Sequence, residues 1–340
     1  MSQASILLLK PIGDQPSPAD QSLGSRLAAT AGAFSEPLVL EQDSFRRGDL
    51  SDLERSLGRW VGKVSGVVGS TGVPESTKLG HLAEQLGLLC FVSNNNPAVW
   101  DGRSHVFHLG VPTSLTTHSV AQYLARDLGA RRVYLLHDET EFQSLVAGRS
   151  GSFLKEAGAE VRSFAGCQNG WVEDVISWAP DVLYLVYSDE GLAVPMIQAL
   201  RAISKNLPVL LGRSLLRQSF LSSLGELAEG LLLLDLFSRG RPRNELEENF
   251  ARVLSDAGID VPTANHGFGW DAMTLCGRAL VEAEGDSKSA IRYLESGVQL
   301  EGATGYYRFN PEDHNGRSAF NPTTLSLVRN ARVEAHPEIC

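Results

Sequence analysis

Residues 66–74 read GVVGSTGVP, and residues 90–97, further along the chain, read CFVSNNNP. Each stretch is a short apolar run, typical of a buried strand, followed by small hydroxyl or amide side chains and then by proline, which is favoured in the first turn of a helix. A helix N-terminus presents unpaired backbone N–H groups and the positive end of a dipole. Two such ends side by side would bind a small anion such as a carboxylate, so the pattern predicts a protein that holds a small molecule.

The alternation of short apolar runs with amphipathic segments continues through most of the 340 residues. It is typical of βα units that build parallel sheets. A chain of this length exceeds the size at which one core usually keeps growing, so we expect two α/β domains. Strands are predicted near residues 6–9, 38–41, 64–68, 88–92, 133–137, 160–164, 182–187, 209–211 and 231–235. After Phe237 the pattern predicts helices at 245–257 and 270–284, then β segments at 305–309 and 324–333.

Charge and hydropathy exclude two classes of partner. The formal net charge is −10, and the sequence contains no block rich in Lys and Arg. A nucleic-acid partner needs such clustered cations. No apolar stretch approaches the roughly 20 residues of a membrane span, so direct insertion into a bilayer is not expected.

Metal and cofactor sites are not expected either. The cysteines, Cys90, Cys167, Cys276 and Cys340, lack metal-ligand spacing and predict no disulfide framework. His105 and His108 lie three apart on an extended segment, so they point to opposite faces and predict two solvated or core-edge histidines. No Gly-x-Gly-x-x-Gly, Gly-x-Ser-x-Gly or His-Glu-x-x-His motif is present, so we expect no cofactor and no enzyme, and a two-domain α/β enzyme is the weakest alternative.

The N-terminus and the cysteines bear on the compartment. The apolar run at residues 6–9 lacks a preceding basic region and reads as a first core strand, not as a signal peptide. We therefore expect a periplasmic or extracellular protein if an export signal has been removed, and a cytoplasmic one if Met1 is the native start. Unpaired cysteines favour a reducing compartment only slightly.

The order and spacing of several short motifs resemble the type I periplasmic binding proteins, in particular the branched-chain amino-acid receptors of ABC transporters. The resemblance spans about residues 64–333. The motifs that carry it are GVVGST (66–71), SNNNP (93–97), HVFH (105–108), RVYLLHD (132–138), GAEV (158–161), APDV (179–182), AEGL (228–231), GWDA (269–272) and GATG (302–305). The resemblance implies two Rossmann-like lobes with parallel sheets, joined by three crossovers, with a ligand cleft between them.

The resemblance also implies where the lobes and the ligand contacts lie. Lobe I would comprise residues 1–112 and 237–318, and lobe II residues 113–236 and 319–340. Two head-group loops would lie in lobe I, and lobe II would supply an aromatic ring and a third strand end. By position these are Ser70 and Thr71 in the first loop, Ser93, Asn94 and Asn95 in the second, Phe142 as the aromatic, and Tyr187, Ser188 and Asp189 at the strand end.

The sequence departs from the family pattern at Arg213 and Ser214, where amino-acid receptors tend to place an acidic residue for the ligand's ammonium group. Arg is a forked partner for carboxylates and would repel an ammonium group, so we expect a ligand with a carboxylate or amide in place of an ordinary α-amino acid. His266, just before the predicted helix that carries Trp270, is a further candidate contact.

These residues have alternative interpretations. Ser70 and Thr71 could cap the helix that follows, Asn94 and Asn95 could form a plain turn, and Arg213 could pair with a surface carboxylate.

The main hypothesis is a non-catalytic receptor that closes on a small polar ligand and presents it to the membrane permease of an ABC transporter. The alternative is a cytoplasmic ligand-sensing regulator of the same fold that acts through a partner protein.

Overall fold

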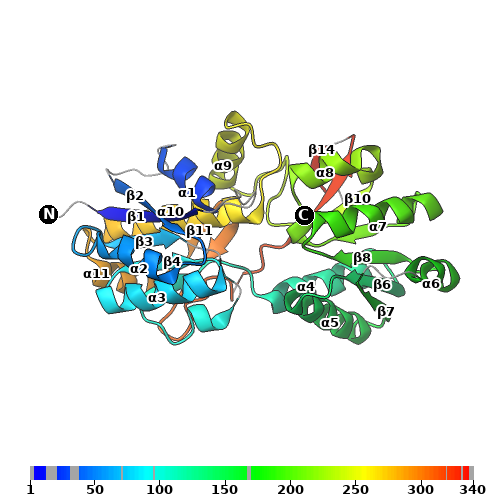
Figure 1. Cartoon of the computed structure of the whole chain (residues 1–340), viewed down its shortest axis with the longest axis horizontal. Helices are drawn as coiled ribbons and strands as arrows, with labels where there is room; N and C mark the ends of the chain where they lie inside the picture. Colours follow the sequence, from blue (N-terminus) through cyan, green and yellow to red (C-terminus); the bar gives the residue numbers. More distant parts are fainter. Residues whose placement is uncertain are drawn as a thin grey trace. The chain divides into compact units, whose positions relative to one another are not determined.

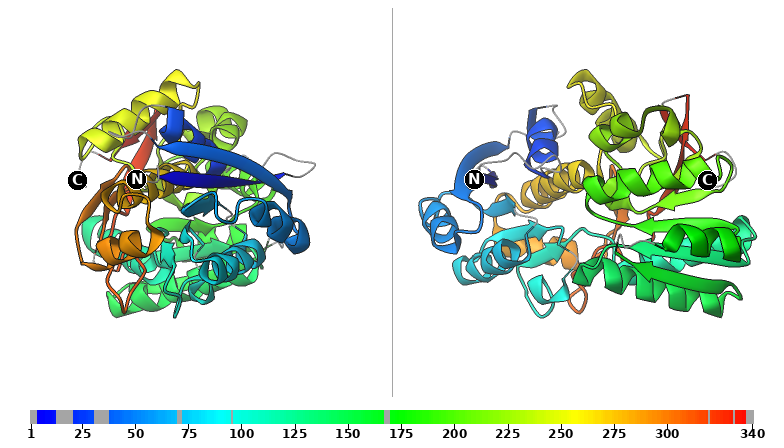
Figure 2. Two further views of the ribbon diagram at one scale, coloured as in Figure 1. Left: turned by 90° about the vertical axis from the view of Figure 1, so that its left-hand side faces the viewer. Right: turned by 45° about the vertical axis from the view of Figure 1, so that its right-hand side comes forward.

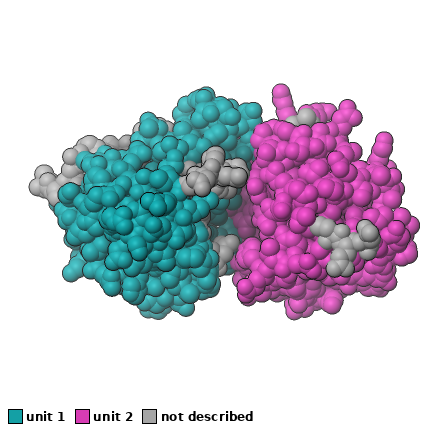
Figure 3. All heavy atoms as spheres, in the orientation of Figure 1, with its two compact units in different colours: residues 1–112, 243–322 teal, residues 113–242, 323–340 magenta. Residues whose placement is uncertain are grey.

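The computed structural model describes residues 4–12, 21–30, 38–69, 72–94, 96–166, 170–318, 320–330 and 332–336. The chain forms two compact units, coloured separately in Figure 3: unit 1 is residues 1–112 with 243–322, and unit 2 is residues 113–242 with 323–340. Each unit is an α/β layer structure, and the chain passes between them after Pro112, Pro242 and Pro322. The predicted α/β fold with two lobes and three crossovers is confirmed.

The elements of each unit are labelled in Figure 1. Unit 1 contains β1 (Ser5–Ile12), α1 (Gln21–Thr30), β2 (Val39–Arg46), α2 (Leu50–Gly58), β3 (Gly66–Gly69), α3 (Val73–Leu86), β4 (Leu89–Val92), η1 (Pro97–Val99), β5 (Val106–His108), α9 (Glu245–Asp256), α10 (Ala264–Glu282), α11 (Ser287–Glu295), β11 (Leu300–Gly302) and β12 (Gly305–Tyr307). Unit 2 contains α4 (Thr113–Gln122), η2 (Tyr123–Asp127), β6 (Arg132–His137), α5 (Glu141–Glu156), β7 (Glu160–Ala165), α6 (Trp171–Trp178), β8 (Val182–Val186), α7 (Glu190–Ile203), β9 (Val209–Leu211), η3 (Arg213–Leu215), α8 (Gln218–Leu224), η4 (Gly225–Ala228), β10 (Leu231–Asp235), β13 (Thr324–Arg329) and β14 (Arg332–Ala335).

The main sheet of unit 1 is parallel, with strand order β2-β1-β3-β4-β5. Val67 and Cys90 share a core with residues of α2 and α3, while Gly66 faces α10 on the other side (Figure 1). A Cβ on Gly66 would lie 2.7 Å from the sulfur of Cys276, and one on Gly69 would lie 2.6 Å from the carbonyl oxygen of Leu9. Both glycines of the GVVG run are therefore required by close packing.

The sheet of unit 2 has the order β14-β13-β10-β9-β8-β6-β7. Strands β6 to β10 pair in parallel, as predicted, but β13 pairs antiparallel with β10 and β14 pairs antiparallel with β13. The β structure predicted at 324–333 is confirmed, and it consists of two strands. β13 and β14 form a hairpin, coloured red in Figure 2, and Asn330 at its turn has φ of 51°. A short turn can join only antiparallel neighbours.

Each sheet is covered by helices that bury alternate residues of its strands. In unit 2, Leu135 of β6, Tyr184 of β8 and Leu210 of β9 are at most 1 % exposed and share a core with α4 and α5. On the opposite face Tyr134 donates to Asp174 of α6 at 2.8 Å. Burying one such large apolar side chain stabilises the fold by about 1.5–3 kcal/mol, so these cores fix the register of the strands.

The second and third connections lie further along the chain than the predicted boundaries after residues 236 and 318. Phe237 accepts a hydrogen bond from Thr324 at 3.0 Å, and Arg239 accepts one from the backbone N–H of Ala335 at 3.1 Å, which ties residues 237–242 to unit 2. Phe320 donates to the carbonyl of Arg317 at 3.1 Å, which ties this segment to unit 1.

Candidate functional site

In unit 1, Ser93 and Asn94 directly follow β4 and are each 8 % exposed. Asn94 Oδ1 accepts the N–H of Asn96 at 2.8 Å, and Asn96 Oδ1 accepts the N–H of Ala98 at 3.1 Å, so the amides shape the turn into η1. β3 is the neighbour of β4 in the sheet, so the two predicted head-group loops leave adjacent strand ends. Ser70, Thr71 and Asn95 lie outside the described residues, and their ligand contacts stay predictions.

The full burial of His108, at the end of β5 beside Asn94, is a feature that the sequence did not predict. It is fully buried, and its ring stacks on Trp100 with centroids 3.6 Å apart. Burial lowers the pKa of His108 to about 3, although polar groups of Asn315 and of the Asn94 backbone oppose this shift. The expectation of a solvated or core-edge histidine is wrong here, because the ring lies in the core against Trp100.

In unit 2, the predicted contacts follow three neighbouring strands. β6, β8 and β9 lie side by side and run parallel, so their carboxyl ends form one edge of the sheet. The residues that follow these ends are Phe142 after β6, Tyr187, Ser188 and Asp189 after β8, and Arg213 and Ser214 after β9. In an open α/β sheet this edge is where ligands bind.

Asp138, which follows β6, organises this edge and was not predicted. Its Oδ1 accepts the N–H of Thr140 at 3.1 Å and the Thr140 hydroxyl, while Oδ2 accepts the N–H and hydroxyl of Ser188 at 3.0 and 2.9 Å. Burial favours a higher pKa for Asp138, but these four hydrogen bonds outweigh it and hold the pKa below its usual value. The Ser188 hydroxyl is thus committed to a neighbouring side chain.

The other residues after β8 also have structural partners. Tyr187 is fully buried, and its hydroxyl donates to the carbonyl of Gly166, just after β7, at 2.9 Å. Asp189 caps α7 by accepting the N–H of Gly191 at 2.7 Å. Phe142, by contrast, is 43 % exposed in the first turn of α5. Its ring is therefore accessible at the sheet edge, as the predicted contact requires.

Arg213 follows β9 and is half-buried beside α4. Its Nη2 donates to the hydroxyl of Thr116 at 2.6 Å, and its positive charge opposes the rise in pKa, to about 12, that burial causes in Tyr184. A guanidinium carries five N–H donors in a fixed fork, and the bond to Thr116 holds this fork just after the carboxyl end of β9.

His266 lies within α10 and not before it, so the predicted helix start at residue 270 is wrong. The N–H of Thr263 donates to His266 Nδ1 at 3.1 Å, and Thr263 Oγ1 accepts the N–H of His266 at 3.4 Å. This reciprocal pair is a capping box, which starts the helix at Ala264. The ring is 95 % buried as a cap, and its contact with a ligand stays a prediction.

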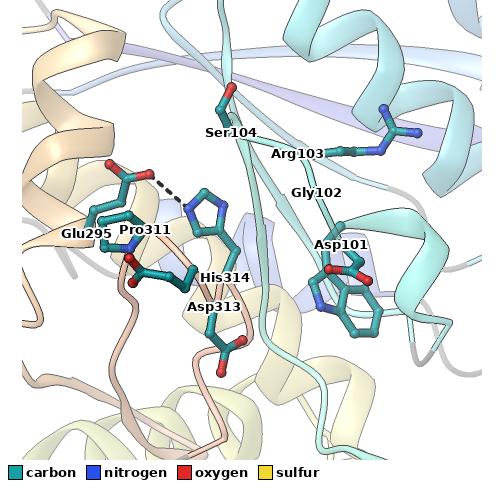
Figure 4. Close-up of a pocket in the computed structure, with 10 residues that line it drawn as sticks. Asp101, Gly102, Arg103, Ser104, Glu295, Pro311, Asp313 and His314 are labelled. Atoms are coloured by element: carbon teal, nitrogen blue, oxygen red, sulfur yellow. Dashed lines mark hydrogen bonds and ion pairs between the residues drawn. The ribbon is translucent and has the colours of Figure 1, made fainter.

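A separate pocket of about 290 Å³ lies within unit 1 and includes none of the predicted contacts (Figure 4). Its lining residues are Trp100, Asp101, Gly102, Arg103, Ser104, Glu295, Pro311, Glu312, Asp313 and His314. His314 Nε2 contacts Glu295 at 3.0 Å, and His314 Nδ1 lies 3.0 Å from the carbonyl of Val106. The histidine thus links the 311–314 loop to β5 and α11.

Two further features concern the described ranges. Within them, no three His, Cys, Asp or Glu side chains come together in a way that could hold a metal ion. None of the helices described there combines the length and the apolar character that crossing a membrane requires.

A family model described as periplasmic binding protein matches residues 57–326. The chain belongs to the periplasmic binding protein family. The match begins before the GVVGST motif and ends within β13, so it includes the carboxyl-edge loops of both units. The resemblance drawn from the short motifs is confirmed. No curated protein sequence matches this periplasmic binding protein.

Solved structures share the fold of this periplasmic binding protein at low sequence identity. A putative branched-chain amino acid ABC transporter protein from Rhodospirillum rubrum has a TM-score of 0.79 at 20 % identity, covering 99 % of this chain and 100 % of its own. The leucine binding protein LivK from Thermotoga maritima has a TM-score of 0.76 at 18 % identity, covering 98 % of this chain and 97 % of its own. LivJ from Streptococcus pneumoniae, in complex with isoleucine, has a TM-score of 0.74 at 17 % identity, covering 98 % of each chain.

Proposed function

We propose that this protein is the solute receptor of an ABC-type uptake system, which binds a small polar ligand and presents it to a membrane permease. The observation that carries the proposal is the family match over residues 57–326. The similar structures support it, because their names describe leucine-binding and branched-chain amino acid transport proteins. Function on this route requires export, so we place the mature protein outside the cytoplasmic membrane.

The ligand contacts residues at the carboxyl edge of each sheet in this proposal. Ser93 and Asn94 supply polar groups from unit 1, and Phe142 and Arg213 supply a ring and a cation from unit 2. Contacts with both units favour a closed conformation over an open one, and only this difference in affinity drives closure. The ligand leaves chemically unchanged, since binding alone performs this task.

Arg213 selects the ligand class. Its guanidinium is half-buried and held by Thr116, and the planar fork of a guanidinium matches the geometry of a carboxylate. An α-ammonium group at the same place would be repelled. We therefore propose an organic acid, or an amide-bearing acid without a free ammonium group, as the best ligand.

Thermal shift tests the proposal first. A panel of organic acids, amides and α-amino acids is compared, because a ligand at 100 times its Kd stabilises a protein by about 2.7 kcal/mol. The best hit is then measured by calorimetry with wild type, Arg213→Ala and Arg213→Lys. Removing the charge-assisted bond should weaken binding about 10- to 100-fold, and Lys should restore only part because the fork is lost.

The matched control is Arg162→Ala. This substitution also removes a cation of unit 2, but Arg162 lies in β7 and pairs with Asp174 of α6, away from the carboxyl end of β9. Its affinity should equal that of wild type. Micromolar binding of leucine with Arg213→Ala indistinguishable from wild type would refute the ligand class. Recovery of a chemically altered ligand after incubation would refute the receptor function itself.

A further inference from the structure

Two of the short sequence motifs, GWDA and GATG, meet in the core of unit 1. Asp271 of α10 is fully buried and accepts the backbone N–H groups of Ala303 at 2.6 Å and Thr304 at 3.0 Å. It also accepts the Tyr307 hydroxyl at 2.7 Å. A carboxylate with this many donors holds the turn between β11 and β12 rigidly against α10.

Arg317 completes this group of side chains, and we call Asp271, Thr304, Tyr307 and Arg317 the Arg317 cluster. Arg317 is fully buried, its Nη2 lies 3.8 Å from Asp271 Oδ2, and its guanidinium carbon lies 3.6 Å from the centroid of the Tyr307 ring. Nη2 also donates to the hydroxyls of Thr304 and Tyr307. Charge, ring face and hydroxyls therefore fix the guanidinium in one position.

The Arg317 cluster hydrogen-bonds to the main chain beside the first connection and lies close to side chains at the ends of the other two. Arg317 Nε donates to the carbonyl of Leu109 at 3.4 Å, just before the connection that follows Pro112. A Cβ on Gly305 would lie 3.2 Å from Arg317 Nη1, 3.3 Å from Pro322 and 3.5 Å from Arg243 Nη1.

Arg243 and Pro322 are the first and last residues of the second segment of unit 1, and Arg243 Nη1 donates to the Pro322 carbonyl at 3.5 Å. A proline is also the last residue before each connection, at Pro112, Pro242 and Pro322. Proline fixes φ, so much of the freedom left to these connections depends on how their ends are anchored.

We propose that Arg317 is a positioning residue that anchors all three connections on unit 1 and thereby sets how easily the protein closes on its ligand. The consequence for affinity rests on the proposed function, whereas the anchoring itself does not. A buried arginine contributes little net stability compared with apolar packing, so a geometric role accounts for it better than a stabilising one. Anchored ends confine the motion to a few residues, which is the requirement for a hinge.

Hydrogen exchange by mass spectrometry on the ligand-free protein tests the anchoring. Arg317 Nη1 also donates to the Tyr306 carbonyl at 3.0 Å, and Arg317→Lys keeps the charge but cannot reach Leu109, Tyr306 and the two hydroxyls at once. We expect amides at 109–113, 242–244 and 320–324 to exchange about tenfold faster, the effect of losing roughly one hydrogen bond's worth of protection. Peptides from β1 and β3 should exchange at the wild-type rate.

The matched control is Arg201→Lys. Arg201 is a buried arginine of unit 2 that donates to the carbonyls of Lys205, Leu207, Leu227 and Glu229, away from the connections. It should leave exchange at the three connections unchanged. Tyr307→Phe is a milder second variant, which removes one hydroxyl of the cluster. It should raise the exchange rate at the same three segments by a smaller factor. It tests the anchoring if Arg317→Lys does not fold.

Faster exchange at all three connections, with an unchanged core, supports the proposal. Faster exchange only around residues 303–307, or uniformly across unit 1, would overturn it, because that is the signature of a purely structural cluster. These readouts need no ligand, so a failure of the receptor hypothesis leaves them valid. Where a ligand is known, Arg317→Lys should also change its Kd at unchanged contacts, and Arg201→Lys should not.

Discussion

Replacing Asp138 should disturb the carboxyl edge of unit 2 more than replacing any of the residues predicted to contact ligand there. Oδ1 accepts two hydrogen bonds from Thr140 and Oδ2 accepts two from Ser188. In Asp138→Asn a single oxygen can serve only one of these residues, and the new NH₂ group faces donors at the other. Loss of two bonds to a charged, buried acceptor should lower the free energy of unfolding of unit 2 by about 3 kcal/mol.

Asp181→Asn is the matched control for this substitution. Asp181 uses one oxygen, Oδ2, to accept the N–H groups of Arg131 and Arg132, both at 2.8 Å. The amide oxygen of Asn can replace it, and the site is exposed, so the loss should stay below about 1 kcal/mol. Denaturant-dependent hydrogen exchange of peptides from β6 and β8 measures unit 2 separately from unit 1.

The pH dependence gives a second test of the same reasoning. Hydrogen bonds hold the pKa of Asp138 below its usual value, so its contribution is present above the ordinary carboxyl pKa and is lost as pH falls through the folded-state pKa. The difference between wild type and Asp138→Asn should therefore narrow below about pH 4. A difference under about 0.5 kcal/mol at pH 7, or one that does not narrow in acid, would refute the assignment.

Further expectations concern buried groups of unit 1. Burial raises the pKa of Cys90 to about 12 and that of Cys276 well above its usual value, so neither thiol should react with iodoacetamide at pH 8 in the native protein, by peptide mapping, until urea unfolds it. His108 should stay neutral in NMR titration to pH 5, and because its pKa of about 3 lies below the unfolded value near 6.5, its contribution to stability should decline as pH falls below about 6.5. Gly69→Ala should cost about 2 kcal/mol in thermal unfolding, because its Cβ would lie 2.6 Å from the Leu9 carbonyl, whereas Gly58→Ala, with nothing within 4 Å, should cost nothing; a native protein that tolerates Gly69→Ala would contradict the close packing of β1 and β3.

The sequence predicted the strands well because apolar runs bounded by glycine and proline carry a local signal. It placed the start of α10 too late, because Gly267 and Gly269 in its first turns weaken the helical pattern and the Thr263–His266 cap is not the usual Ser-x-x-Glu form. It also read the C-terminal hairpin as one segment, since Asn330 alone marks the turn. In each case a few residues at the end of an element override the periodicity.

The polar interior could not be predicted in the same way. Arg317 reads as a surface cation, and its partners Leu109 and Asp271 are far away in the chain, so only the tertiary fold brings them together. A weaker signal was present in Asp271, an acid within an apolar helical run. The carboxylate of Asp138 was likewise overlooked, although it stands directly after a strand, because nothing in the sequence shows that Ser188 is its partner.

These side-chain partners narrow what the carboxyl edge of unit 2 can offer a ligand. The Ser188 hydroxyl donates to Asp138, the Tyr187 hydroxyl donates to Gly166, and Asp189 accepts from its own helix. All three were expected from the family resemblance to contact ligand, and each is used to hold the loop after β8 in place. In the proposed receptor function, selectivity on this unit then depends mainly on the Phe142 ring and the Arg213 guanidinium, an aromatic and a cation. That pair suits an anionic ligand with an apolar body, which is the chemistry that the Arg213 variants test.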